Sequence, residues 1–142
     1  MSNSLRVEPG LPPVLAYIQM REEAGWGLIS NKTATSCLEG SLYGVCLYDQ
    51  DTLIGFSRLV GDGVLYFYIA DVVVSPKHGG KGYGSLLMTA IMDYIHAHAQ
   101  TGATIALLSA PGLEPFYGQF GLTPCPNRLF GQGLSYVVGQ EC

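Results

Sequence analysis

The sequence predicts an α/β (α+β) fold, with a mixed, mostly antiparallel central sheet flanked by helices. Three segments with strand composition, at 41–48, 53–60 and 66–74, follow one another through short turns, so we expect them to be antiparallel neighbours. A long amphipathic helix then separates the third strand from a wholly apolar segment at 103–109. Because a helix joins them, we expect 103–109 to be a buried strand that runs parallel to 66–74.

Other segments complete one domain that spans residues 1–142. In chain order we expect a short strand, two helices, a further helix and a last strand, at 5–7, 14–23, 36–38, 111–121 and 134–138. Of the 142 residues, 48% are hydrophobic, which is enough apolar material for a core. No internal repeat or linker divides the chain.

The composition excludes several classes of partner. The formal net charge is −4 and no basic run occurs, which argues against nucleic acid and mildly favours a cationic partner such as an amine. No apolar run approaches the ~20 residues of a membrane span, so we expect no membrane partner. The N-terminus lacks the layout of a signal peptide, and we expect a cytoplasmic protein.

Cysteine and histidine spacings do not favour a metal. The four cysteines show no C-x-x-C pair, which makes a zinc or disulfide framework improbable. His96 and His98 are two residues apart, so on a helix they point in different directions. We therefore expect no metal site.

A glycine-rich turn between strand 66–74 and the long helix is the main candidate for binding chemistry. It contains Gly79, Gly80, Gly82 and Gly84, interleaved with Lys81 and Tyr83 and followed by Ser85. The first turn of a helix has amide groups without carbonyl partners, and glycines let a ligand approach them closely. The turn thus suits phosphate or pyrophosphate, although it can equally be a tight connection without a ligand.

The turn does not match either of two known phosphate-binding motifs. A Walker loop would need Lys-Ser/Thr where Ser85-Leu86 stand, and the dinucleotide fingerprint needs a G-x-G-x-x-G spacing that is absent. The pattern V-V-V-x-P-x-x-x-G-K-G-x-G before an amphipathic helix instead resembles motif A of the GNAT superfamily of acetyl-CoA-dependent N-acetyltransferases. Gly79 departs from it, since that position usually holds Gln or Arg.

The resemblance implies a GNAT fold whose sheet is splayed between its fourth and fifth strands. It implies acetyl-CoA as the co-substrate, held by backbone amides of the turn and of the strand end. The cofactor-binding residues would be Val72, Val73, Val74, Gly79, Gly80, Lys81, Gly82, Tyr83, Gly84 and Ser85.

Two side chains are candidates for proton transfer. Tyr117, in the segment Phe116-Tyr117 to Phe120-Gly121-Leu122, matches the tyrosine that commonly acts as general acid in this family, although Leu122 replaces the usual Phe. Asp71 is the first candidate for the base, because it is a lone acid in an apolar strand, and such sites are enriched in function. A purely structural carboxylate is an equal alternative for Asp71.

The acceptor site is expected from aromatic and acidic residues. We expect contributions from Glu23, Tyr17, Trp26, Tyr66, Tyr68, Phe130 and the turn at 131–133, because aromatic rings bind the apolar body of an amine. In the resembled family, the helix and loop that correspond to 14–27 form one wall of that site. Glu23 is also the second candidate for the base. The alternative for this segment is a helix end whose charges are simply solvated.

Three functions remain open at this point. The first is acetyl transfer to the primary amine of a small molecule, and the motifs are similar to the serotonin/arylalkylamine N-acetyltransferase branch. The second is acetylation of protein lysines or N-termini, and the third is a non-catalytic acetyl-CoA-binding sensor. Many GNAT proteins pair through their C-terminal strands, so a homodimer is also expected.

Overall fold

The computed structural model describes residues 4–140, which form two compact units with the division after residue 108. The first unit holds a five-stranded sheet in the order β1-β2-β3-β4-β5, in which only β4 and β5 are parallel. Its strands are β1 (Leu5–Pro9), β2 (Tyr43–Asp49), β3 (Thr52–Gly61), β4 (Tyr66–Val74) and β5 (Thr104–Ala106). The expected mixed, mostly antiparallel sheet is confirmed.

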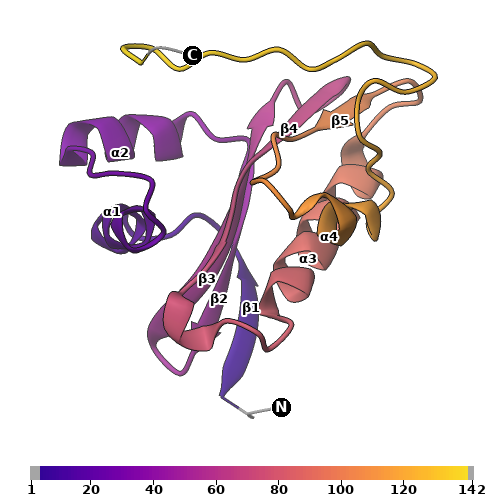
Figure 1. Cartoon of the computed structure of the whole chain (residues 1–142). Helices are drawn as coiled ribbons and strands as arrows, with labels where there is room; N and C mark the ends of the chain where they lie inside the picture. The colour runs from indigo at the N-terminus through magenta and orange to yellow at the C-terminus, as the bar shows by residue number, and fades with distance from the viewer. Residues whose placement is uncertain (1–3, 141–142) are drawn as a thin grey trace. The chain divides into compact units, whose positions relative to one another are not determined.

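Three helices cover the two faces of this sheet (Figure 1). They are α1 (Val14–Glu23), α2 (Asn31–Glu39) and α3 (Tyr83–His98), with a 3₁₀ turn η1 (Pro76–His78) before α3. Tyr17 of α1 and Leu38 of α2 share a buried cluster with Phe56 and Val73 of the sheet. On the other face, a Cβ built on Gly55 of β3 would lie 3.2 Å from Leu87 of α3. The sheet is therefore the middle of three layers.

Helix α2 is longer than expected, because the sequence indicated only residues 36–38. Its boundary is set by Ser30, whose hydroxyl accepts a hydrogen bond from the Thr33 amide at 3.1 Å and caps the helix. Only Ala34 and Leu38 are buried along it. With so few apolar positions, the helical period is hard to detect in the sequence.

The hairpin between β3 and β4 is fixed by one side chain. Asp62 Oδ1 accepts hydrogen bonds from the amides of Val64, Leu65 and Tyr66 at 2.8–3.0 Å. These bonds lower the pKa of the Asp62 carboxyl. The turn signal in the sequence is confirmed, and it brings β4 back beside β3.

Strand β5 differs from the prediction in length and in burial. Only Thr104–Ala106 are extended, and they are half-buried or exposed, whereas we expected a buried strand over 103–109. The parallel pairing with β4 is confirmed but covers only Tyr66, Phe67 and Tyr68. The two strands thus part early, as the resemblance implied, and β5 leaves the rest of β4 uncovered along that edge.

The second unit, described over 109–140, contains one short helix, α4 (Glu114–Gly118). The expected last strand at 134–138 is wrong for the described chain, since these residues are irregular and exposed. Leu134 and Val138 have relative exposures of 91% and 85%, so strand composition there finds no partner to complete a ladder. No helix within residues 4–140 is long and apolar enough to cross a bilayer.

Candidate active site

The glycine turn presents a row of backbone amides. Gly80 and Gly82 have φ values of +75° and +79°, which an L side chain rarely adopts, and a Cβ built on either meets nothing within 4 Å. Gly82 precedes α3 as its N-cap without a side-chain cap. Within the described chain, the amides of residues 80–85 donate no hydrogen bond to another protein group.

Those amides form a site suited to an anion. The N-terminus of α3 carries the positive end of the helix dipole, and Lys81 adds a full charge beside it. A hollow of about 380 Å³ lies against Lys81, Gly82, Tyr83 and Leu86. Open space, donors without partners and positive potential therefore coincide at the place where the sequence predicted pyrophosphate binding. The residues present fit that group.

The outer edge of β4 offers further backbone donors. Ser75 donates from its amide to Ile54 of β3 at 2.8 Å, so by antiparallel alternation Val73 and Asp71 also direct their amides toward β3. Val72 and Val74 then direct theirs to the opposite edge, beyond the part of β4 that β5 covers. Of the three valines expected to bind the cofactor through their amides, the structure favours Val72 and Val74. Val73 instead belongs to the core.

A bulge in β4 decides which face carries Asp71. Arg58 pairs with Asp71 and Leu59 with Ile69, so Ala70 is an extra residue in β4. Asp71 and Val73 lie on the face covered by α1, as the Asp71–Tyr17 contact and the shared cluster show. Asp71 and Val73 therefore share one face of the sheet.

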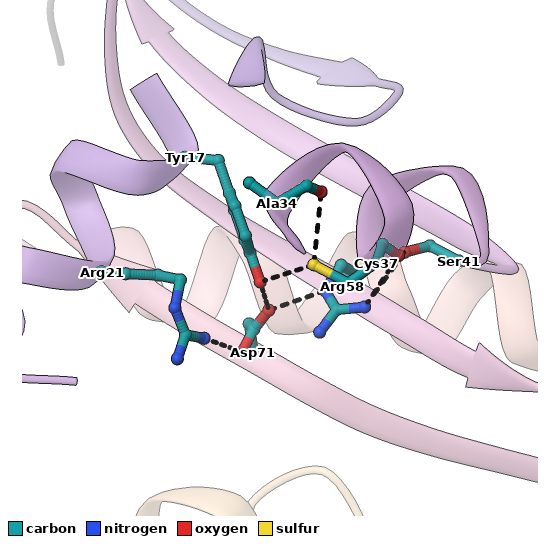
Figure 2. A network of polar contacts seen from close by, with 7 residues as sticks. All are labelled: Tyr17, Arg21, Ala34, Cys37, Ser41, Arg58 and Asp71. Carbon is teal, nitrogen blue, oxygen red and sulfur yellow. Dashed lines mark hydrogen bonds and ion pairs between the residues drawn. The ribbon is translucent and has the colours of Figure 1, made fainter. Parts of the chain in front are cut away.

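Asp71 is the centre of a buried network of polar side chains (Figure 2). Its Oδ2 accepts hydrogen bonds from Arg58 Nε at 2.7 Å and from the Tyr17 hydroxyl at 3.1 Å, while its Oδ1 lies 3.9 Å from Arg21 Nη1. Cys37 donates its thiol hydrogen toward the Tyr17 hydroxyl at 3.7 Å. The carboxylate is thus balanced by side chains, and Oδ1 is the oxygen that accepts no hydrogen bond within residues 4–140.

The network shifts the ionisation of its members. Burial, and then the charge of Asp71, raise the pKa of Tyr17 to about 12, so the phenol stays protonated and donates at neutral pH. Burial opposes the charge of Arg58, but the hydrogen bond and charge of Asp71 outweigh it and raise the pKa of Arg58. Arg58 therefore keeps its charge at every physiological pH.

Sequence reasoning found Asp71 but missed its partners. Arg58 is a lone charge in the apolar run Phe56-Ser57-Arg58-Leu59-Val60, and it lies directly across from Asp71 in the register. That pair of opposite charges in neighbouring strands was the available signal. Tyr17, expected beside the acceptor, is fully buried and instead supports the carboxylate.

The expected acceptor residues are exposed but lie in separate places. Trp26, Tyr66 and Tyr68 have relative exposures of 41%, 63% and 38%. Tyr68 pairs with Val60, so Tyr66 and Tyr68 share the face of Asp71, and Trp26 contacts Arg21 at the end of α1. Glu23 lines a different hollow of about 270 Å³, with Lys77 and His78 among its walls. No hydrogen bond, ion pair or ring contact joins any two of these four within the described chain.

Tyr117 lies on α4 in the second unit. Its ring packs edge-on against Phe116 at 5.1 Å, and burial raises the pKa of the Tyr117 phenol above its ordinary value. A phenol that keeps its proton at neutral pH suits a general acid. No cluster of metal-ligating side chains occurs in the described chain.

Comparison with known proteins gives a consistent result. Residues 18–138 match the family model described as "Acetyltransferase (GNAT) domain". The chain is 29% identical over 114 residues to the uncharacterized N-acetyltransferase ycf52 of Gracilaria tenuistipitata var. liui, which is 78% of this chain and 62% of that protein. It is 30% identical over 81 residues to serotonin N-acetyltransferase 2, chloroplastic, of Oryza sativa subsp. japonica, which is 57% of this chain and 40% of that protein.

The chain thus spans less than two thirds of the length of each of these two relatives. Among solved structures, it is similar to SA2161 of meticillin-resistant Staphylococcus aureus, a protein of unknown function and probable acetyltransferase. The TM-score is 0.82 at 32% identity, over 93% of this chain and 99% of that chain. Similarity therefore extends through both units.

Proposed function

The chain belongs to the GNAT family of acetyltransferases, and we propose that it transfers an acetyl group from acetyl-CoA to the primary amine of a small molecule. The observation that carries this proposal is the row of backbone amides at residues 80–85. They donate no hydrogen bond within the described chain, and the space around Gly80 and Gly82 is open. They would bind the pyrophosphate of the co-substrate, with Lys81 adding charge.

The edge of β4 would hold the rest of the co-substrate. The amides of Val72 and Val74 face outward and are suited to the amide groups of pantetheine and to the thioester oxygen. Acetyl-CoA supplies the activated acyl group when bound. Holding it at two places beside the amine converts an encounter into a bound pair, which can contribute about 7–11 kcal/mol to lowering the barrier.

Two side chains would move protons. Asp71 is the residue before Val72, whose amide faces outward, and Asp71 Oδ1 accepts no hydrogen bond in the described chain. We therefore assign Oδ1 the role of accepting the proton of the attacking amine. The neutral phenol of Tyr117 would donate its proton to the leaving thiolate. Direct attack in a ternary complex needs no covalent group on the enzyme.

A thiol-release assay with acetyl-CoA and a panel of aryl, alkyl and polyamines tests this function. We expect turnover on at least one free amine, and a kcat lower by about 10²–10⁴ in Tyr117→Phe with acetyl-CoA affinity unchanged. Tyr136→Phe, at an exposed tyrosine of the same unit, is the matched control. Unchanged turnover in Tyr117→Phe removes the general-acid role. Acetyl-CoA binding without turnover on any amine favours the sensor.

A protein or peptide amine is the second candidate acceptor. The exposure of Trp26, Tyr66 and Tyr68 favours it, because an extended peptide needs an open surface rather than a closed cavity. Peptides with free N-termini or lysines, compared with free amines at equal concentration, separate the two. Faster turnover on peptides would replace the first proposal by the second.

A further inference from the structure

Arg21 is the most exposed of the three charged members of the Asp71 network. The side chains of Asp71 and Arg58 have relative exposures of 6% and 11%, whereas that of Arg21 reaches 21%. Its Nε is buried and has no hydrogen-bond partner among the residues that the structure describes. A guanidinium with an unpaired donor at the edge of a buried network is an unusual arrangement, because arginine donors are normally satisfied.

The local fold of α1 holds this arginine in place. Gly25, with φ +81°, ends the helix; its amide donates to Glu22 and the Trp26 amide donates to Arg21, both through backbone oxygens. This is a Schellman end, which brings Trp26 back over Arg21. The guanidinium carbon lies 5.6 Å from the Trp26 ring centre and 5.7 Å from that of Tyr17. Two rings thus fix its position.

The charges of the network do not balance. Asp71 makes its short contact with Arg58 at 2.7 Å, and its distance to Arg21 is 3.9 Å. Arg21 forms no other ion pair within residues 4–140. Two guanidinium groups therefore share one carboxylate, and the positive charge in excess lies at the more exposed end.

The excess charge lies beside the atom assigned to the amine. Asp71 Oδ1, which would take the amine's proton, is 3.9 Å from Arg21 Nη1. A ligand with an ammonium group and a carboxylate close together would place the first on Oδ1 and the second on the guanidinium. Arginine binds carboxylates through paired, charge-assisted hydrogen bonds.

We propose that the acceptor is an α-amino acid, and that Arg21 binds its carboxylate while Asp71 faces its amino group. This proposal rests on the proposed function and narrows its substrate class from amines to amines that carry a carboxylate on the adjacent carbon. Arg21 is then a residue that determines specificity. The exposed part of the Trp26 ring would contact the side chain of the same amino acid.

Paired substrates test the proposal. Leucine with isoamylamine, phenylalanine with phenethylamine, and lysine with cadaverine differ only by the carboxylate. We expect wild-type kcat/KM to favour the amino acid of at least one pair by roughly 10- to 100-fold, as expected for hydrogen bonds between charged groups. Arg21→Gln should raise KM for that amino acid by a similar factor and change KM for the decarboxylated amine far less.

Arg21→Lys and Arg6→Gln complete the design. The lysine keeps the charge without the planar fork, so it should restore part of the lost affinity. Arg6 is an exposed arginine on β1 that pairs with Glu8, and Arg6→Gln should behave as wild type. A merely structural role of Arg21 would change both members of a pair alike, which would overturn the proposal, as would equal wild-type kcat/KM for every pair.

A binding measurement separates this proposal from the function on which it rests. Trp26 is the only tryptophan of the chain and contacts Arg21, so its fluorescence reports ligand at Arg21 without turnover. We expect a saturable change with the preferred amino acid in the wild type, absent with its decarboxylated partner and in Arg21→Gln. A saturable fluorescence change without acetyl transfer would support the Arg21 site and refute the enzyme function. Acetyl transfer to amines without a saturable change would support the enzyme function and refute the Arg21 site.

Discussion

The glycine turn and the Asp71 network solve the problem of binding charge in opposite ways. The turn uses backbone amides of residues 80–85, which donate no hydrogen bond in the described chain and can therefore donate to a ligand. The network uses side chains from α1, α2, β3 and β4, and most of their polar atoms already have a hydrogen-bond partner within the protein. We infer that the turn serves a ligand at little cost in stability, whereas the network couples function to folding.

The largest expected effect is on stability and comes from the network. Asp71→Asn leaves Arg58 buried with an uncompensated charge, so we expect the free energy of unfolding to fall by about 3–5 kcal/mol. Urea denaturation measures this. Asp93→Asn, at an exposed position on α3, should change it by less than about 0.5 kcal/mol. If both variants unfold alike, the network does not hold the fold together.

The next effect is on affinity and comes from the turn. Gly82→Asp introduces a negative charge at the N-cap of α3, and aspartate is among the residues that tolerate positive φ. We expect the affinity for CoA in calorimetry to weaken by about 3 kcal/mol, with unfolding changed by about 1 kcal/mol.

Gly102→Asp is the matched control for that change. Gly102 has φ +91° and open space around it, but it lies in the connection between α3 and β5. Its variant should carry the same backbone strain and keep the affinity for CoA. Equal losses of affinity in both variants would mean that strain, and not the lost anion site, is responsible.

A smaller effect concerns alkaline pH. The pKa of Tyr17 is raised to about 12 from an ordinary value of 10, so its stabilising contribution is complete below pH 10 and is lost as the pH rises toward 12. Two pKa units correspond to about 2–3 kcal/mol. Burial raises the pKa of Cys46 from an ordinary value of 9 to about 11, so its thiol adds a loss of stability that begins lower, as the pH rises from 9 toward 11.

Denaturation at pH 9 to 12 of wild type and Tyr17→Phe measures the Tyr17 part. The phenylalanine variant should begin less stable and then lose less stability over this range than the wild type. Parallel curves would show that the Tyr17 hydroxyl does not titrate with the native state.

The same contrast explains what could be predicted from sequence. The glycine turn is local: strand, proline, glycines and helix follow one another, so their spacing predicted the amide site and bounded β4 correctly. The hairpin was equally local, since Asp62 acts on residues two to four positions away. Such features follow from backbone conformation, which short sequence patterns report.

The partners of Asp71 could not be predicted in this way. Tyr17 lies 54 residues from Asp71 and Arg58 lies 13 residues away, so their contacts depend on sheet register and helix placement. Composition also misled at 134–138, where β-branched and aromatic residues remain irregular because no neighbouring strand pairs with them in the described chain. Strand propensity needs a partner before it becomes a strand.

The extra residue in β4 has a consequence for how the chain tolerates change. Ala70 shifts the alternation of side chains by one, so Phe67 and Ile69 face α3 while Asp71 and Val73 face α1. If Ala70 paired as an ordinary strand residue, Asp71 would point away from Arg58 and into the apolar layer around Leu87. Deletion of this alanine would instead restore regular alternation and keep the carboxylate opposite Arg58, so the bulge is what lets one residue be lost here without moving the acid to the other side of the sheet.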